Sequence, residues 1–314
     1  MTLQPASLTD LSRLLADRHA ARGPVSAVDL AALAAVREYT PEDMTVTVEG
    51  GMLLAELQVL LAARGQWLPI DPPHAARVTV RQLLSENLFG PRRCGFGTIR
   101  EHLIGLEAVL ADGRVTHSGG RVVKNVAGYD LLKLFVGARD SLGIITAATF
   151  KLRPLPEQEI LLSAQFDSLT AACAAVESIL NSPVTPVILD LHNLPHAPSA
   201  TAAFTVLLGF AGTREEIQWQ HARAGGFQPP SLPSTHEQAF WSGTTAVHTT
   251  SVLPSNLPTA LASFTSAPFI ARAANGIIHH QAPPPPRPPS TTHSLAQRLK
   301  STFDPHHILP DAPL

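Results

Sequence analysis

Residues 119–156, GGRVVKNVAGYDLLKLFVGARDSLGIITAATFKLRPLP, decide the fold of this chain. The stretch starts with a glycine turn and ends with a β-branched run at 144–152, which predicts a strand stopped by prolines. Between them, Lys124 and Asn125 stand among valines. Polar groups facing an interior need partners, because burying one alone costs about 1–3 kcal/mol. These two residues therefore either bond locally or belong to a site.

The hydrophobic pattern around this stretch predicts alternating strands and helices. Leucines at helical spacing follow Ser7, which predicts a helix capped by that serine. Upstream of residue 156, the pattern predicts helices over 29–37, 53–64 and 130–135, and strands over 44–48, 103–110 and 115–117. Downstream, it predicts strands over 160–166, 187–192 and 203–210, and helices over 168–180 and 213–224.

The length and the pattern indicate two domains. A chain of 314 residues accommodates two domains of roughly 150 residues each. Strand–helix alternation begins after Pro156, so we expect a first domain over 1–156 and a second over 157–314. The segment PPPPRPP at 283–289 predicts an extended polyproline II loop or spacer, with a docking motif as the alternative.

The composition excludes several classes of protein. Hydrophobic residues make up 45% of the chain, which excludes a disordered polymer, and the net charge of −2 offers no basic surface for nucleic acid. Cys94 and Cys173 form no CxxC pair, which excludes a disulfide framework and a four-cysteine metal site. No secretory signal and no long apolar run is present. We therefore expect a cytoplasmic protein, attached to a membrane at most through partner subunits.

Several motifs resemble one flavoprotein family. KNVAGYDLLKLFVG at 124–137 is the most specific, and DPPH at 71–74, GPRR at 90–93 and LAQRLKSTFDPHHILP at 295–310 fit the same pattern. Together they resemble an FAD-binding subunit of bacterial glycolate oxidase (glycolate dehydrogenase), within the vanillyl-alcohol-oxidase-like, PCMH-type FAD-binding flavoproteins. The likeness covers most of the chain and is most secure over residues 44–156.

The resemblance implies a fold, a cofactor and partners. The fold is α+β: a two-subdomain PCMH-type FAD-binding domain followed by a ferredoxin-like α+β cap domain. The implied cofactor is FAD, and the implied substrate is a 2-hydroxy acid, glycolate. Electrons would leave through a catalytic FAD-containing subunit and an iron–sulfur subunit. The resemblance assigns no catalytic residue.

Eight residues are placed against FAD by the resemblance, at its diphosphate or adenine side and along the rest of the groove. They are Pro72, Thr79, Gln82, Gly90, Gly97, Gly143, Ile144 and Ile145. Gly143 also fits this role on its own chemistry, because a residue without a side chain lets a flat ligand approach the backbone.

The chain departs from the family pattern where the diphosphate should lie. A glycine-rich loop expected after Gly23 is missing, Arg81, Gln82 and Asp140 replace glycines, and Phe89 replaces a serine. Side chains at these places block close approach of backbone N–H groups. Asp140 is the mildest change, because aspartate tolerates the left-handed region, and Arg81 could pair with a phosphate directly.

These departures leave alternative functions open. In the first, the chain is the FAD-binding subunit of a glycolate oxidase-like complex. In the second, it is a non-catalytic structural subunit of the same fold that has lost flavin binding and docks on an FAD-bearing partner. A third, a self-sufficient flavin oxidoreductase on a substrate such as a sugar nucleotide, has no motif in its support.

Other reactive side chains are weaker candidates. His279 and His280 are adjacent, and neighbours on a strand point to opposite faces, so we expect surface histidines and no metal pair. We expect Cys94 to fill a small apolar gap rather than to react. Arg272 could hold a substrate carboxylate or form an exposed ion pair.

Overall fold

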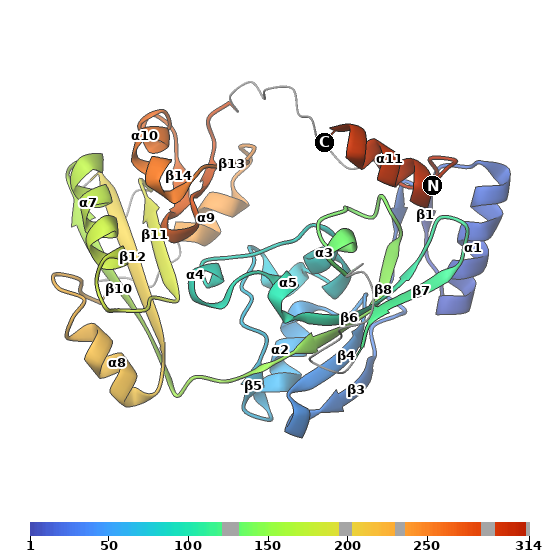
Figure 1. The fold of residues 1–314 in the computed structure, drawn as a ribbon, viewed down its shortest axis with the longest axis horizontal. Coiled ribbons are helices and arrows are strands. Elements are labelled where there is room, and N and C mark those ends of the chain that lie inside the picture. The colour runs from blue at the N-terminus through green and yellow to red at the C-terminus, as the bar shows by residue number, and fades with distance from the viewer. Residues whose placement is uncertain (121–131, 195–202, 230–235, 284–292, 312–314) are drawn as a thin grey trace. The chain divides into compact units, whose positions relative to one another are not determined.

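A computed structural model describes residues 1–120, 132–194, 203–229, 236–283 and 293–311. Lys124, Asn125, the expected helix start at Asp130 and nearly all of PPPPRPP lie outside the described residues. The chain divides into two compact units, each with its own sheet and core (Figure 1). Unit 1 comprises Met1–Phe89, Thr98–Leu155 and Arg287–Leu314, and unit 2 comprises Gly90–Gly97 and Pro156–Pro286.

Unit 1 is built on a five-stranded antiparallel sheet in the order β3-β4-β8-β6-β7 (Figure 1). Its strands are β3 (Val36–Thr40), β4 (Thr45–Glu49), β6 (Leu103–Val109), β7 (Val115–Gly119) and β8 (Ile144–Lys151). Its helices are α2 (Leu54–Ala62), α3 (Val80–Ser85), α5 (Ile99–His102) and α6 (Leu132–Phe135). Short elements complete it: β5 (Gln66–Trp67) with β9 (Arg153–Pro154), and 3-10 turns η1 (Pro41–Asp43) and η2 (Ala75–Arg77).

Alternation along the strands explains which face of this sheet is buried. Val46 and Val48 of β4 pack in the main core with Phe150 of β8, and all three are at most 1% exposed. Leucines of α2 and α3 cover the same core. Because strand side chains alternate, Thr47 and Glu49 point to the other face.

A smaller core lies at the N-terminal helix of unit 1. Helix α1 (Leu8–Ala21) begins where Ser7 accepts a hydrogen bond from the Asp10 N–H at 3.1 Å, which confirms the expected cap. Strands β1 (Thr2–Leu3) and β2 (Ala27–Val28) pair in parallel beside it. Leucines of α1 pack with Ile308 and Leu309, which follow the last helix, α11 (His293–Phe303).

Two expectations for unit 1 are wrong. Residues 29–37 form no helix: the Asp29 carboxylate accepts from the Ala31 N–H at 3.0 Å, and β3 pairs with β4 from Val36 onward. Sheet pairing here overrides the helical spacing. Residues 293–311, expected in the second domain, belong to unit 1, because Leu299 and Phe303 of α11 pack against its main core. The other expected elements of 44–152 that lie in the described residues are confirmed, with ends shifted by one or two residues.

Unit 2 is built on a six-stranded antiparallel sheet in the order β10-β12-β11-β14-β15-β13 (Figure 1). Its strands are β10 (Gln158–Phe166), β11 (Ile188–His192), β12 (Phe204–Gly212), β13 (His248–Ser251), β14 (Phe269–Arg272) and β15 (Ile277–His280). Its helices are α4 (Arg93–Phe96), α7 (Leu169–Leu180), α8 (Arg214–His221), α9 (His236–Ser242) and α10 (Leu257–Ala262), with 3-10 turns η3 (Pro254–Asn256) and η4 (Ala273–Asn275). The elements expected over 160–224 are confirmed, and so is the α+β class.

The segment Gly90–Gly97 belongs to unit 2 through one close approach of backbones. The Gly95 N–H donates to the Val187 carbonyl at 3.2 Å. A Cβ on Gly95 would lie 2.7 Å from the Val187 Cα, so only glycine fits there.

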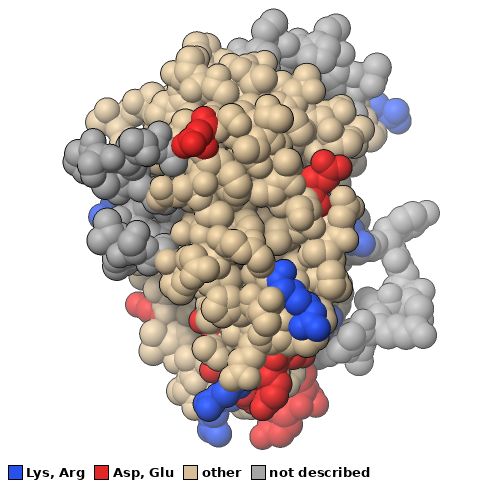
Figure 2. Space-filling model, turned by 90° about the vertical axis from the view of Figure 1, so that its left-hand side faces the viewer, with Lys and Arg blue, Asp and Glu red and all other residues tan. Residues whose placement is uncertain are grey.

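A long stretch of unit 2 carries no charge. Residues 238–271 contain no Asp, Glu, Lys or Arg. Figure 2 shows one side of the molecule, on which uncharged residues predominate and scattered charged side chains are most frequent near the lower end. Depletion of charge is typical of the buried part of protein–protein interfaces.

Candidate functional site

The eight residues predicted against FAD divide between the two units. Pro72, Thr79, Gln82, Gly143, Ile144 and Ile145 lie in unit 1, and Gly90 and Gly97 bound the short segment of unit 2. Within unit 1, Gln82 and Ile144 line one small cavity together with Arg81 and Asp140. Pro72 is buried in the loop before η2, and Ile145 is buried in the main core.

Thr79 and Gln82 form a capping box at the start of α3. The Thr79 hydroxyl accepts from the Gln82 N–H at 3.2 Å, and the Gln82 side-chain oxygen accepts from the Thr79 N–H at 3.1 Å. The helix therefore begins where these two side chains satisfy its first free donors. The neighbouring N–H groups are also occupied: that of Val80 donates to the Met52 carbonyl and that of Arg81 to the Gly50 carbonyl, both at 2.8 Å.

Arg81 and Asp140 form an ion pair at the side of α3. One guanidinium nitrogen of Arg81 binds the Asp140 carboxylate, and another donates to the Val28 carbonyl at 2.7 Å. The two side chains are only 15% and 17% exposed. The sequence allowed Arg81 to pair with a phosphate, and the structure gives it a carboxylate from the same chain.

The backbone at Asp140 is left-handed, as the replaced glycine suggested. Its φ is +62°, and that of Arg139 is +49°. Consecutive non-glycine residues in this region are uncommon and store strain. Burial raises the pKa of the Asp140 carboxyl, against the opposing effect of Arg81, and its Oδ1 atom is buried without a hydrogen bond.

A cavity beside Arg81, about 150 Å³ in volume and here called the Arg81 cavity, borders Gln82 and Ile144, two of the residues predicted against FAD. Val25, Ser26, Ala27, Val28, Arg81, Gln82, Ser85, Glu86, Asp140, Ile144 and Pro310 line it. Pockets for drug-sized ligands usually measure about 300–1,000 Å³. This cavity is therefore too small for the extended adenine dinucleotide.

The donors around the Arg81 cavity do not fit a diphosphate either. In the segment that replaces the glycine-rich loop, the N–H groups of Val25, Ser26 and Asp29 donate to the carbonyls of Ile308, Met1 and Leu3 at 2.7–2.9 Å. Backbone N–H groups hold an anion only when they converge on it unpaired. The N–H groups of Val25, Ser26 and Asp29 are therefore not free to hold a diphosphate.

Packing within unit 1 explains why residue 143 is a glycine. A Cβ at this position would lie 3.0 Å from the Val109 carbonyl oxygen and 3.1 Å from the Phe135 ring. The space beside its Cα is filled by the chain itself. Contact of Gly143 with FAD stays a prediction.

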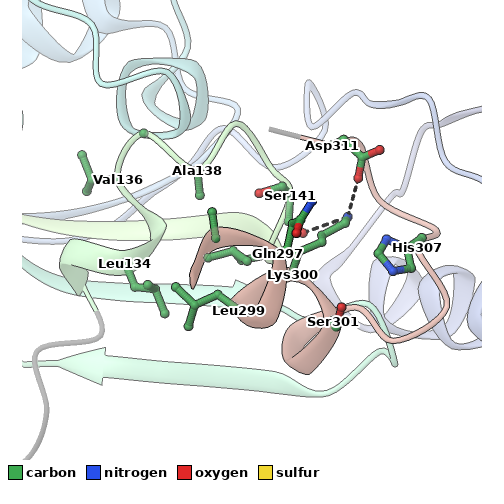
Figure 3. A pocket seen from close by; sticks show the side chains of 13 residues that line it. Leu134, Val136, Ala138, Ser141, Gln297, Leu299, Lys300, Ser301, His307 and Asp311 are labelled. Carbon is green, nitrogen blue, oxygen red and sulfur yellow. Dashed lines mark hydrogen bonds and ion pairs between the residues drawn. The ribbon is translucent and has the colours of Figure 1, made fainter. Parts of the chain in front are cut away.

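A larger cavity borders the loop that contains Asp140, and the polar contacts in its wall stabilise the fold. It measures about 670 Å³ and lies between residues 134–142 and α11, with Lys300 in its wall (Figure 3). The Lys300 ammonium donates to Asp304 at 2.7 Å and to the carbonyls of Ser141, Leu309 and Pro310 at 2.9–3.1 Å. With acceptors available to all three of its N–H groups, Lys300 holds the loop and the tail together.

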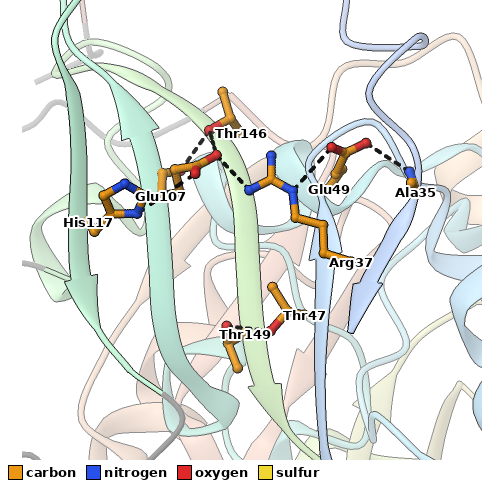
Figure 4. A network of polar contacts seen from close by, with 8 residues as sticks. All are labelled: Ala35, Arg37, Thr47, Glu49, Glu107, His117, Thr146 and Thr149. Carbon is orange, nitrogen blue, oxygen red and sulfur yellow. Dashed lines mark hydrogen bonds and ion pairs between the residues drawn. The ribbon is translucent and has the colours of Figure 1, made fainter. Parts of the chain in front are cut away.

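A second polar network crosses the open face of the unit 1 sheet (Figure 4). Arg37 of β3 binds Glu49 of β4 at 3.1 Å and Glu107 of β6 at 2.9 Å. Thr146 of β8, fully buried, donates to the same Glu107 carboxylate at 2.8 Å. The network joins four strands, and each charge in it has a partner, so it stabilises the sheet.

Unit 2 contains a buried charge cluster that sequence reasoning placed wrongly. Arg272, 1% exposed, binds the Asp190 carboxylate at 2.5 Å and also binds Glu237 of α9. It forms neither an exposed ion pair nor an open carboxylate site, because two carboxylates of the chain already occupy its guanidinium. His279 and His280, expected at the surface, are 5% and 0% exposed, because β15 is covered on both faces. The β-branched residues Ile277 and Ile278 just before them are the sequence signal that indicates a buried strand here.

Cys94 is held as a thiol. Its Sγ lies 3.3 Å from the Pro186 carbonyl oxygen, and burial, with Asp190 nearby, raises its pKa to about 12. A thiolate is the reactive form of cysteine, so this residue is inert at neutral pH.

Acid should destabilise unit 2 through His279. Burial, helped by Arg272, lowers the pKa of His279 from 6.5 to about 3. The stability that this neutral histidine provides is complete above pH 6.5 and is lost as the pH falls, by about 1.4 kcal/mol per pH unit. Asp190, whose pKa is raised to about 6, offsets part of this loss below that pH. Urea unfolding at pH 7 and pH 5 should show the wild-type loss and a smaller one in His279→Gln.

The exposed His221 of the same unit provides the control for that measurement. His221→Gln should keep the wild-type difference between the two pH values. An equal acid loss in His279→Gln would assign the effect to other groups.

Metal-binding clusters and membrane-spanning helices are both absent from the described residues. No group of three or more His, Cys, Asp or Glu side chains there is placed to hold a metal ion. Among the helices of the described ranges, none has the length and apolar character that crossing a membrane demands.

Comparison with known proteins identifies the type of domain. Residues 10–119 match the family described as FAD binding domain. The chain is 36% identical over 160 residues to glycolate oxidase subunit GlcD of Bacillus subtilis (strain 168), covering 51% of this chain and 34% of that protein. It is 35% identical over 125 residues to glycolate oxidase subunit GlcE of Escherichia coli (strain K12), covering 40% and 36%.

A third relative and two solved structures extend the comparison. The probable mitochondrial D-lactate dehydrogenase of Danio rerio is 33% identical over 190 residues, covering 57% of this chain and 38% of that protein. The chain thus spans between about a third and two fifths of the length of these relatives. Two crystal forms of alkyldihydroxyacetonephosphate synthase align with TM-scores of 0.75 and 0.73 at 17% identity, covering 98% of this chain and 75% and 76% of theirs.

These findings establish the fold and the type of domain. The chain has the PCMH-type FAD-binding fold, and the relatives named above are glycolate oxidase subunits and a probable D-lactate dehydrogenase. FAD is the cofactor of this domain family. The cavity beside Arg81, about 150 Å³ in volume, is too small to hold that cofactor.

Proposed function

We propose that this chain is a non-catalytic structural subunit of a glycolate oxidase-like complex. In the complex, a catalytic FAD-containing subunit oxidises the 2-hydroxy acid, and electrons leave through an iron–sulfur subunit. The present chain contributes a domain of the same fold that binds no flavin of its own. Its likeness to two differently named glycolate oxidase subunits supports membership of a multi-subunit assembly.

The ion pair between Arg81 and Asp140 is the observation that carries this proposal. It lies beside Gln82, one of the residues predicted against FAD, and the cavity next to it has a volume of about 150 Å³. The carboxylate would also repel an anionic cofactor. The exposed part of the uncharged stretch at 238–271, which includes Leu253 at 67% exposed, would suit contact with a partner subunit.

A second function, that of an FAD-binding subunit in the same complex, is favoured by the match of residues 10–119 to the FAD binding domain family. In that case FAD would contact Pro72, Thr79, Gln82, Gly90, Gly97, Gly143, Ile144 and Ile145. Binding would then require Arg81 to leave Asp140 and the segment 25–28 to withdraw from the cavity.

The chain purified alone should show no visible absorption bands of oxidised flavin, and extraction with acid should release no FAD. The reason is that the N–H groups and the charge needed at the diphosphate are already occupied. A relative with an intact glycine-rich loop, purified in parallel, provides the positive control. Stoichiometric FAD in the isolated chain would contradict the structural role and favour the second function.

The complex provides the complementary measurement. Co-expression with the two partner subunits should give glycolate oxidation whose flavin content matches the catalytic subunit alone. Omitting this chain should reduce the yield of assembled complex. The absorption spectrum of the flavin in the catalytic subunit should stay unchanged. Turnover of glycolate by this chain alone would contradict the proposal.

A further inference from the structure

Helix α2 of unit 1 is apolar on both of its faces. Seven of its nine residues, LAELQVLLA at 54–62, are hydrophobic. Leu54, Leu57 and Leu61 are buried in the main core. On the opposite face, where a surface helix usually carries polar residues, Val59 is 74% exposed. An apolar face of α2 therefore stays exposed among the described residues.

This exposed face forms a groove with the neighbouring strand β3, here called the α2 groove. Its volume is about 720 Å³, and its apolar wall consists of Tyr39 of β3 and of Ala55, Val59, Leu60 and Ala63. The spacing of Ala55, Val59 and Ala63 by four residues places them in one row along the helix. Alanines at both ends of this row and a valine at its centre leave room for a second helix to approach closely.

One charge of each sign stands at either end of the α2 groove. Glu56 lies in the first turn of α2 and Arg64 lies two residues beyond its end, and both line the groove and are exposed. Neither side chain forms a hydrogen bond or an ion pair with another of the residues that the structure describes. At a rise of about 1.5 Å per residue, about 12 Å separates them along the helix, with Leu60 midway. A two-fold axis through that midpoint sets Glu56 of each copy against Arg64 of the other, so the surface is complementary to itself.

We infer that the α2 groove is the contact between two copies of this chain, packed as a symmetric dimer in which the two α2 helices run antiparallel. Val59 and Leu60 of both copies form the apolar centre of the contact, and two ion pairs between Glu56 and Arg64 close its ends. The groove is smaller than the about 20–30 residues that each partner contributes to a standard interface. The dimer is therefore weak and depends on protein concentration.

Sedimentation velocity of the full chain, over about a hundredfold range of concentration, measures this dimer. The wild type should shift from monomer toward dimer as the concentration rises. Glu56→Arg or Arg64→Glu alone brings like charges together at both ends, and Val59→Asp places a charge in the apolar centre. Each should raise the dissociation constant of the dimer at least about tenfold. All three positions are exposed, so the chain should stay folded, which circular dichroism checks.

Mixing the two single charge variants makes the test specific to a pair of copies. When Glu56→Arg meets Arg64→Glu, opposite charges face each other again at both ends, so a mixed dimer should form with nearly wild-type affinity. The double variant Glu56→Arg/Arg64→Glu should regain it as well. A role of the two charges within their own helix predicts the opposite for the double variant, because the helix dipole favours an acid at the N-terminal end and a base at the C-terminal end. Glu177→Arg, at an exposed position of α7, makes the same change in charge as Glu56→Arg and should leave the dimer unaffected.

A wild-type chain that stays monomeric over the whole range of concentration would overturn the inference. Failure of the mixed variants to associate, or an equal loss in Glu177→Arg, would do the same, because the effect would then come from the net charge or from a changed fold. Binding of a catalytic FAD-containing subunit at the α2 groove of a monomeric chain would assign this face to that partner instead of a second copy. The proposed function is tested by the flavin content of the wild-type chain, which none of these sedimentation measurements uses.

Discussion

Replacing Asp304 with alanine should lower the free energy of unfolding of unit 1 by about 3–5 kcal/mol, the range for breaking a buried ion pair from one side. Asp304 is completely buried. Its Oδ2 atom accepts from the Lys300 ammonium at 2.7 Å and from the Leu309 N–H at 2.8 Å, and its Oδ1 atom accepts from the Ile308 N–H at 3.0 Å.

The loss is large because three donors lose one acceptor group. The buried Lys300 charge would keep the carbonyls of Ser141, Leu309 and Pro310 and the more distant, exposed Asp311 carboxylate. Figure 3 shows Ser141 and Asp311 beside Lys300. Ile308 and Leu309 would lose their backbone contacts to the carboxylate, and both pack in the smaller core with α1. Detachment of this tail would expose that core to water.

Urea unfolding followed by circular dichroism measures the effect. Asp311, 83% exposed and 4.0 Å from the Lys300 ammonium, supplies the matched control. Asp311→Asn should leave the free energy of unfolding within about 0.5 kcal/mol of the wild type. Asp304→Asn keeps one acceptor oxygen and should lose less than the alanine variant. Equal stability of Asp304→Ala and wild type would show that the carbonyls alone suffice for Lys300.

How far the sequence predicts the structure depends on how local each feature is. The strand over 44–48 follows from alternation and the strand over 144–152 from a β-branched run, and neighbouring residues determine both signals. The helix expected over 29–37 does not form, because pairing of β3 with β4 outweighs a short helical spacing. An aspartate four residues after Lys300 was visible in the sequence, but its burial depends on residues 308–310 folding back over it.

The residues of the candidate site likewise divide into features that the local sequence predicts and contacts between distant residues that it does not. Arg81 and Asp140 each stand out in the sequence as replacements of glycine. The positive φ of Asp140 could be expected, because a glycine at that position signals a left-handed backbone. Their pairing joins positions 59 residues apart, which no local pattern reveals. The burial of Arg272 was missed for a similar reason, because its partners Asp190 and Glu237 come from a different strand and from α9.

Replacing Arg272 with methionine should lower the free energy of unfolding of unit 2 by about 3–5 kcal/mol at pH 7, because it leaves buried carboxylates without their cation. Asp190 is 2% exposed, and Glu237 lies nearby on α9. Methionine keeps most of the side-chain volume, so the loss reports charge rather than a cavity.

The pH dependence of this variant identifies Asp190 as the source of the loss. Burial already raises the pKa of Asp190 to about 6, and Arg272 opposes that rise, so removing the arginine moves the pKa higher still. A carboxyl whose folded pKa exceeds its unfolded value of 3.8 destabilises the fold as the pH rises through the folded pKa. The penalty of Arg272→Met should therefore shrink between pH 7 and pH 5.

A second substitution tests this cause independently. Asp190→Asn added to Arg272→Met should recover part of the lost stability at pH 7 and should abolish most of the difference between the two pH values. Arg214→Met, at an exposed position of α8, controls for the loss of one positive charge and should cost no more than about 0.5 kcal/mol. A penalty for Arg272→Met that is the same at pH 5 and pH 7 would mean that the unpaired Asp190 charge is not its source.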